Sequence, residues 1–282
     1  MMAITDILPS ISGIKGALPV SYSRMQQLFN CPLAFTLKYI RKTRLPEPQL
    51  SDDIVLGKRA HWVMENTVHH AALNDAYESA FNFYHARALE SSSNEFQRMR
   101  MAQLYEPMHG VCERLCKMLS VPDTYAYTEK NIKLSTLGIP MKGKTPFKGF
   151  GKPSSLGFTG YIDLEMRRGG KLNLVDYKTE LPSDSRRQEV ISQTAVYAYI
   201  EFISDPTIDT ASTYCIYLRD GTVDKVASYN RAENFNELED KVLGMFTRYA
   251  QILKEGVLPE PKENKYCVYC GFKNAGMCTL KG

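Results

Sequence analysis

The stretch GYIDLEMRRGGKLNLVDYKTE, residues 160–180, decides the fold of this protein. Apolar and polar residues alternate on both sides of Gly169-Gly170, a pair that is favoured in two-residue hairpin turns. The pattern predicts two antiparallel strands joined at these glycines. A tight turn places Arg168 opposite Lys171 and fixes the register of every other pair along the hairpin.

The predicted register sets two acidic residues directly against each other. Asp163 faces Asp176 with Cβ atoms about 4.5–5.5 Å apart, where like charges repel, and Lys178 emerges on the same face. Paired carboxylates need a cation, and their hard oxygen atoms suit Mg²⁺ or Mn²⁺. A neighbouring lysine can orient a water molecule or offset negative charge. The sequence therefore predicts a metal-dependent hydrolytic site, whereas a merely exposed hairpin leaves the opposition unexplained. A β-bulge in the turn would change this register.

The residues on either side of this hairpin divide, by their hydrophobic periodicity, into a helix-rich part and a strand-rich part. We interpret residues 1–282 as a single α/β domain, with a helical insertion at 57–120, a mixed-sheet core at 121–230 and a cysteine-rich tail at 257–282. In the first expected helix, 21–40, Ser23 and Gln26 form a candidate capping box, and Pro32 opens a second helix. The other expected elements are strands 126–134, 156–166, 172–179 and 211–218 and helices at about 186–202 and 232–255.

Composition excludes several classes of protein. With 44% hydrophobic residues and 35 basic against 31 acidic side chains, the chain is neither a fibrous nor a disordered polymer. No apolar run reaches 18 residues and the first residues do not resemble a secretion signal, so we expect a cytoplasmic protein without membrane contact. Seven cysteines in such a chain indicate metal binding or catalysis rather than disulfides.

A lysine-only segment follows the first expected strand of the core. Between residues 130 and 162 there are six lysines, no arginine and no acid, and Lys142, Lys144, Lys148 and Lys152 lie in its glycine- and proline-rich middle. Such a loop suits a phosphate backbone, although a solvated loop remains the alternative. Residues 138–145, GIPMKGKT, match the sequence pattern of a phosphate-binding loop. The glycines and prolines that follow prevent the helix that such a loop requires, so we do not expect nucleotide binding here.

The C-terminal cysteines have the spacing of a chelating site. Cys267 and Cys270 form a C-x-x-C pair, and Cys278 follows after seven intervening residues. An iron–sulfur cluster and Zn²⁺ both fit this spacing, and each requires a fourth thiolate. The remaining cysteines of helices and strands, Cys112, Cys116 and Cys215, are expected in the core.

Ordered motifs across nearly the whole chain resemble the PD-(D/E)XK nucleases. The motifs are VSYSRMQQLFNCP at 20–32, GKRAH at 57–61, GYID at 160–163, DYK at 176–178, QTAVY at 193–197 and the terminal cysteines. The resemblance is closest to the RecB/AddB-like exonuclease branch, which includes the CRISPR-associated RecB-like exonucleases. It implies a restriction-endonuclease-like mixed sheet.

The resemblance also implies roles for individual residues. Asp163 and Asp176 would bind Mg²⁺ or Mn²⁺, with His61 completing the metal shell, and Lys178 would be the catalytic lysine. Gln193 and Tyr197, which share a helix face, would orient the DNA strand or the lysine. Glu129, at the start of the first core strand, is a further candidate.

The same resemblance makes Cys31 the fourth ligand of a [4Fe-4S] cluster with Cys267, Cys270 and Cys278, which would clamp the two ends of the domain together. Zn²⁺ on the same thiolates is the alternative. The implied function is a Mg²⁺- or Mn²⁺-dependent deoxyribonuclease, most simply an exonuclease on single strands or DNA ends, in repair, recombination or antiviral defence. No helicase motif is present, so duplex opening requires a helicase or integrase partner or a frayed end. The rival interpretations are a DNA-end-binding subunit with little cleavage and a zinc-stapled RNA-processing nuclease.

Overall fold

The computed structural model describes residues 18–40, 43, 45, 52–74, 76–134, 156–254, 261–264 and 267–278. The chain divides into two compact units, which are treated separately. Unit one comprises residues 1–49, 133–160 and 240–282, and unit two comprises 50–132 and 161–239. None of the helices in the described ranges is both long and apolar enough to cross a membrane.

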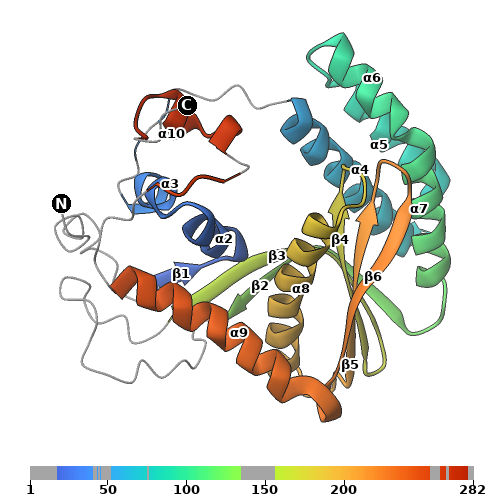
Figure 1. Cartoon of the computed structure of the whole chain (residues 1–282). Coiled ribbons are helices and arrows are strands. Elements are labelled where there is room, and N and C mark those ends of the chain that lie inside the picture. The colour runs from blue at the N-terminus through green and yellow to red at the C-terminus, as the bar shows by residue number, and fades with distance from the viewer. Residues whose placement is uncertain are drawn as a thin grey trace. The chain divides into compact units, whose positions relative to one another are not determined.

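Unit two begins with four helices that pack on one another (Figure 1). These helices cover the region that we expect to be helical, residues 57–120, and the first of them begins slightly earlier in the chain. They are α4 (Asp52–Asn74), α5 (Tyr77–Glu90), α6 (Glu95–Gln103) and α7 (Tyr105–Leu119).

The strands of unit two form a mixed sheet. In spatial order they run β2 (Thr124–Leu134), β3 (Leu156–Arg168), β4 (Lys171–Lys178), β5 (Thr210–Tyr217) and β6 (Thr222–Asn230). β4 is antiparallel to β3 and parallel to β5, while β5 and β6 are antiparallel. Helix α8 (Asp184–Ser204) makes the crossover from β4 to β5 and packs against β4, β5 and β6. This mixed sheet with helices confirms the expected fold class.

The hairpin register is the one that the glycine pair predicts. Arg168 lies opposite Lys171, and the pairing continues without a bulge to Leu164 opposite Val175. Gly169 has a positive φ of 55°, a conformation that glycine adopts without steric cost. A Cβ on Gly170 would collide with the Asp209 carboxylate, so neither glycine tolerates a side chain well.

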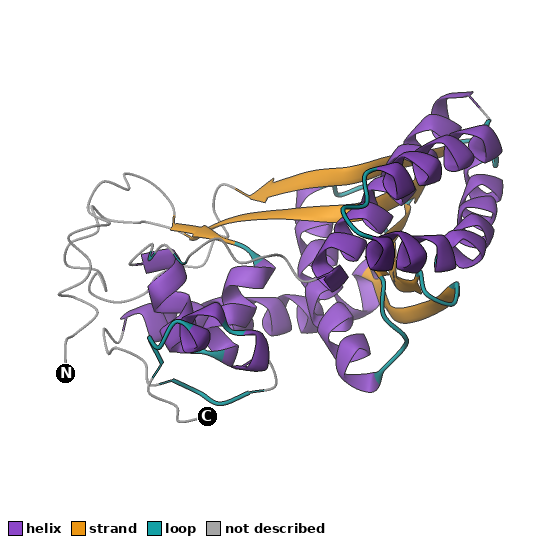
Figure 2. Cartoon of the chain, turned by 90° about the horizontal axis from the view of Figure 1, so that it is seen from above, coloured by secondary structure: helices purple, strands orange, loops and turns teal. Residues whose placement is uncertain are grey.

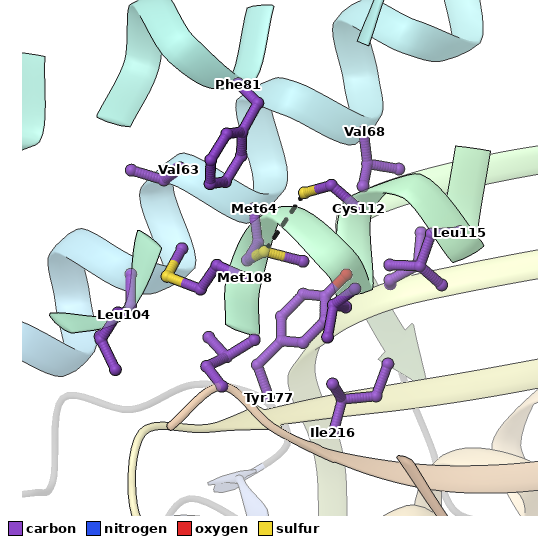
Figure 3. Packing of buried hydrophobic residues seen from close by; sticks show 14 of the residues in the cluster. Val63, Met64, Val68, Phe81, Leu104, Met108, Cys112, Leu115, Tyr177 and Ile216 are labelled. Atoms are coloured by element: carbon purple, nitrogen blue, oxygen red, sulfur yellow. Dashed lines mark hydrogen bonds between the residues drawn. The ribbon is translucent and has the colours of Figure 1, made fainter. Parts of the chain in front are cut away.

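A large apolar core joins the helices of unit two to its sheet. Figure 3 shows Met64 of α4, Phe81 of α5 and Cys112 of α7 above Tyr177 of β4 and Ile216 of β5. All five side chains are at most 2% exposed. β4 is consequently covered on both faces, by α4 and α7 on one side and by α8 on the other, which fixes the strand that carries Asp176 and Lys178.

Unit one holds both the N-terminal helices and the cysteine tail. Its elements are β1 (Leu18–Val20), α2 (Tyr22–Asn30), α3 (Pro32–Phe35), a π-helix at Thr36–Ile40, most of α9 (Arg231–Lys254), a 3-10 turn at Cys267–Tyr269 and α10 (Gly271–Asn274) (Figure 2). β1 pairs in parallel with the first three residues of β3. A small apolar cluster of Ala34, Leu37 and Phe272 joins α3 and the π-helix to α10.

The structure corrects one detail of the sequence analysis and adds two strands. The cap of α2 is Ser21, whose hydroxyl accepts the Arg24 N–H, because Ser23 already lies inside the helix. Pro32 opens α3 as expected, with Cys31 as the preceding residue. Strands β1 and β6 had no strong sequence signal, since the first is short and the second is half polar. Residues 138–145 and Lys142, Lys144, Lys148 and Lys152 lie outside the described ranges.

Candidate metal-dependent active site

Helix α4 brings His61 to the C-terminal end of β4. Gly57, one helical turn earlier, lies near the residue that follows β4, since a Cβ there would be 3.6 Å from Thr179 Oγ1, an ordinary van der Waals contact. His61 Nε2 is 3.0 Å from the Tyr177 carbonyl oxygen, so this nitrogen carries the proton and donates it. His61 Nδ1 then faces Asp163, at 3.6 Å from Asp163 Oδ2. This orientation leaves a lone pair on Nδ1 of the neutral ring, directed at the carboxylates.

Asp163 lies one residue beyond the last ladder pair of the hairpin. Its Oδ2 accepts a 2.7 Å hydrogen bond from the Tyr177 backbone N–H. Burial raises the pKa of Asp163, but the His61 ring, that N–H group and the Lys178 ammonium lower it further, and the net pKa is below the ordinary value. Asp163 is therefore ionised over the whole neutral range.

Asp176 and Lys178 form a buried ion pair on β4. Lys178 Nζ is 2.5 Å from Asp176 Oδ2, and Asp176 is only 4% exposed. Burial raises the pKa of Asp176, and the nearby charge of Asp163 adds to the effect against the opposing influence of Lys178. Burial lowers the pKa of Lys178, but Asp176 and Asp163 outweigh it, so the net pKa is raised and the lysine is cationic.

Glu129 of β2 joins this group through an unusual backbone conformation. Its φ is +46°, in the left-handed region that non-glycine residues rarely adopt, and it lies within a strand. Ligand atoms of His61, Glu129 and Asp163 all lie within 4.8 Å of one another. Burial and the charges of Asp163 and Glu65 raise the pKa of Glu129.

These residues fit a divalent cation. One imidazole nitrogen and two carboxylates converge on one point, and the ring's other nitrogen is held by a backbone carbonyl, the usual support of a metal-binding histidine. Apart from the Lys178 ion pair, the buried Asp176 Oδ2 has no hydrogen-bond partner in the described part of the chain. Oxygen-rich donors of this kind suit Mg²⁺ or Mn²⁺.

Two further predicted residues lie together on α8. Gln193 Nε2 donates a 3.2 Å hydrogen bond to Tyr197 Oη, as their i, i+4 spacing allows. Tyr197 is 6% exposed, and α8 packs on β4. The other cysteines behave as expected in two cases, since Cys112 and Cys215 are fully buried, while Cys116 is only partly buried.

The four remaining cysteines are gathered in unit one. Cys31 and Cys270 both pack against the Ala34–Leu37–Phe272 cluster, although 239 positions separate them in the sequence. Asn264 joins the two segments, because its side chain donates to the Asn30 carbonyl oxygen at 2.9 Å. Its backbone N–H also donates to Cys267 Sγ at 3.3 Å, as amides do toward metal-bound thiolates.

Comparison with known proteins identifies the fold. The family model of the PD-(D/E)XK nuclease superfamily matches residues 19–275. The chain belongs to this superfamily. It is therefore a nuclease, of a kind that uses divalent metal ions.

Solved structures are similar over nearly the full length. A candidate exonuclease from Eubacterium rectale has a TM-score of 0.50 at 12% identity, covering 93% of this chain and 89% of the other. The protein SSO0001 has a TM-score of 0.37 at 12% identity, with 99% and 96% covered. At these identities the likeness concerns the fold alone. The search of curated proteins found no match.

The structure brings Asp176 and Lys178 of the DYK motif close to His61 and Asp163, since the charges of Asp163 and His61 both influence the pKa of Asp176. The sequence offered Glu129 only as a further candidate, because no motif surrounds it. Its left-handed backbone, visible only in the structure, is the signal that distinguishes it.

Proposed function

We propose that this nuclease hydrolyses phosphodiester bonds in DNA with Mg²⁺ or Mn²⁺ and acts on single strands or DNA ends, as an exonuclease. The observation that carries the proposal is the convergence of His61, Glu129 and Asp163 beside the buried Asp176–Lys178 pair. A protein that only binds DNA gains nothing from carboxylates held this close. This argues against the alternative of an end-binding subunit with little cleavage.

Each residue has a distinct task in the proposed mechanism. His61, Glu129, Asp163 and Asp176 would hold the metal ion. A bound divalent ion supplies Lewis-acid stabilisation of negative charge at the scissile phosphate. Lys178, cationic because of its neighbours, stabilises charge that develops on the phosphate and orients the attacking water by donating a hydrogen bond. Gln193 and Tyr197 would orient the strand or the lysine from α8.

The cysteines of unit one would hold a [4Fe-4S] cluster. Cys31, Cys267, Cys270 and Cys278 are the proposed ligands, and Zn²⁺ is the alternative.

Lys142, Lys144, Lys148 and Lys152 would bind the DNA backbone. Replacing all four with Gln should weaken DNA binding and reduce the slope of log affinity against log salt by about 3 on single-stranded DNA, since each lost phosphate contact accounts for about 0.7. Fluorescence anisotropy with an oligonucleotide between about 50 and 200 mM salt measures that slope. An unchanged slope would show that these lysines are only solvated.

The proposal is tested with end-labelled DNA and anaerobically purified protein. Single-stranded, blunt duplex and matched RNA substrates are incubated with Mg²⁺, Mn²⁺ or EDTA, and products are resolved at nucleotide resolution. Metal-dependent shortening of single-stranded DNA from an end supports the proposal. Binding without cleavage in every metal favours the end-binding subunit, and faster RNA cleavage favours the RNA-processing nuclease. Cleavage of duplexes only with an added helicase would indicate the expected partner.

A further inference from the structure

The residue that follows Glu129 is tied into a network of buried charges. Lys130 Nζ donates to both carboxylate oxygens of Glu165, at 2.9 and 2.8 Å, and to Glu201 Oε1 at 2.9 Å. Glu165 is fully buried on β3, and Glu201 is 3% exposed on α8. One ammonium group therefore fastens β2 to a neighbouring strand and to the crossover helix.

Arg167 of β3 binds the same two carboxylates from another side. Its Nε is 2.5 Å from Glu165 Oε1, one terminal nitrogen bonds Glu201, and the other is 2.6 Å from Asp205 Oδ2. Arg167 is thus a natural comparison for Lys130: both are cations of one network, but only Lys130 is adjacent to Glu129 in the chain.

The anchoring explains how the left-handed residue is maintained. A non-glycine residue keeps a positive φ only where the surrounding structure over-determines its conformation. Glu129 is such a residue, and the three hydrogen bonds of Lys130 fix the chain directly after it. The turn of the backbone places the Glu129 carboxylate beside His61 and Asp163 rather than along the regular strand direction.

We infer that Lys130 is a positioning residue for the metal site, holding the backbone of β2 so that Glu129 reaches His61 and Asp163. The inference rests on the proposed function, since it concerns the divalent ion that those residues would bind. Lys130 is not among the residues that would hold the metal ion, because its ammonium group is bonded to Glu165 and Glu201. Loss of outer supporting contacts typically weakens metal binding about 10- to 100-fold.

The test compares Mn²⁺ affinity among network variants by isothermal titration calorimetry on the full-length protein, well below each melting temperature. Lys130→Met alone leaves two buried carboxylates to share Arg167, so the double variant Lys130→Met/Glu201→Gln balances the charge and protects the fold. We expect it to raise the Mn²⁺ Kd about 10- to 100-fold. Lys130→Arg, which keeps the cation, should restore most of the affinity.

Arg167→Met/Glu201→Gln, which changes the charge of the network by the same amount, is the matched control. It removes a cation from the same carboxylates and should lower the melting temperature, yet leave the Mn²⁺ Kd within about twofold, because β2 stays anchored. Glu129→Gln should weaken Mn²⁺ binding as much as the Lys130 double variant, and combining the two should add little, since both act through one carboxylate.

Wild-type Mn²⁺ affinity in the Lys130 double variant would overturn the inference. Equal weakening by Arg167→Met/Glu201→Gln would also overturn it, because the network would then act only through general stability. Absence of Mn²⁺ binding by the wild-type protein would instead overturn the proposed function, and the inference with it.

Discussion

The carboxylate site of unit two and the cysteine region of unit one are built on opposite principles. Around Asp163 three groups from other elements converge: the His61 ring from α4, and the Tyr177 amide and the Lys178 charge from β4. The cysteine region is joined by three buried apolar residues, Ala34, Leu37 and Phe272, and by the hydrogen bond from Asn264 to Asn30. The first site is held in place by protein contacts, whereas under our proposal the second would be held together by the group that its cysteines bind.

Substitutions in the carboxylate site should therefore reduce activity more than they reduce the stability of the fold. Asp176→Asn keeps the shape of the side chain but removes a negative metal ligand. We expect cleavage to fall by more than about 100-fold, since a metal ion contributes several kcal/mol to charge stabilisation. Single-turnover rates on labelled single-stranded DNA measure this.

The uncharged amide also leaves the buried Lys178 with Asp163 instead of its ion-pair partner Asp176, so the melting temperature of the metal-free variant should decrease slightly. A rate within threefold of wild type would remove Asp176 from the site.

Lys178→Met separates catalysis from binding. In the proposed mechanism the lysine stabilises charge but does not bind the metal, so turnover should decrease about 100-fold while the Mn²⁺ affinity decreases little. Lys171→Met, an exposed lysine at the other end of β4, is the control and should behave like wild type. If the Lys178 variant lost DNA affinity instead, the lysine would be a phosphate contact and not a catalyst.

The cysteine region should behave differently, because a substitution there should remove the bound group and reduce the stability of the region at the same time. Cys31→Ser should lose most of the iron and acid-labile sulfide of anaerobically purified protein, because one cluster iron would lack its ligand. The tail keeps the Phe272 packing and the Asn264 hydrogen bond, so Cys31→Ser/Phe272→Ala should be needed for rapid proteolysis of the segment.

Cys112→Ser is the matched control, since that thiol lies in the other core and should retain all iron. Colourless wild-type protein with stoichiometric zinc would contradict the cluster. Full iron in the Cys31 variant would place the fourth ligand elsewhere.

The smallest expected effect is a pH dependence of stability in metal-free protein. Burial lowers the pKa of His61, but Asp163 and Asp176 raise it above 6.5 on balance. The folded state then holds the proton more tightly than the unfolded state, so this stabilisation is complete below pH 6.5 and is lost as pH rises through the folded pKa.

Thermal melts in EDTA should show wild-type stability decreasing across neutral pH, and His61→Gln should flatten the curve. A wild-type curve that rises with pH in that window would contradict the assigned environment of His61.

The sequence alone determined the hairpin and most of the site. Alternation and the Gly169-Gly170 turn fix the register, because a one-residue slip would reverse every side chain on a two-sided strand. The register of the hairpin follows from local periodicity. So do the place of His61 on the face of α4 and the shared face of Gln193 and Tyr197 on α8. The helical character of residues 57–120 also follows from local periodicity.

Only the tertiary structure decided which distant groups meet. It ended the ladder at Leu164–Val175, so that Asp163 binds the Tyr177 amide, and it turned the backbone at Glu129 through contacts of Lys130 with β3 and α8. It also joined Cys31 to Cys270 through Phe272. Local propensity carries no record of such contacts, because they depend on elements far apart in the chain that become neighbours only when the core is packed.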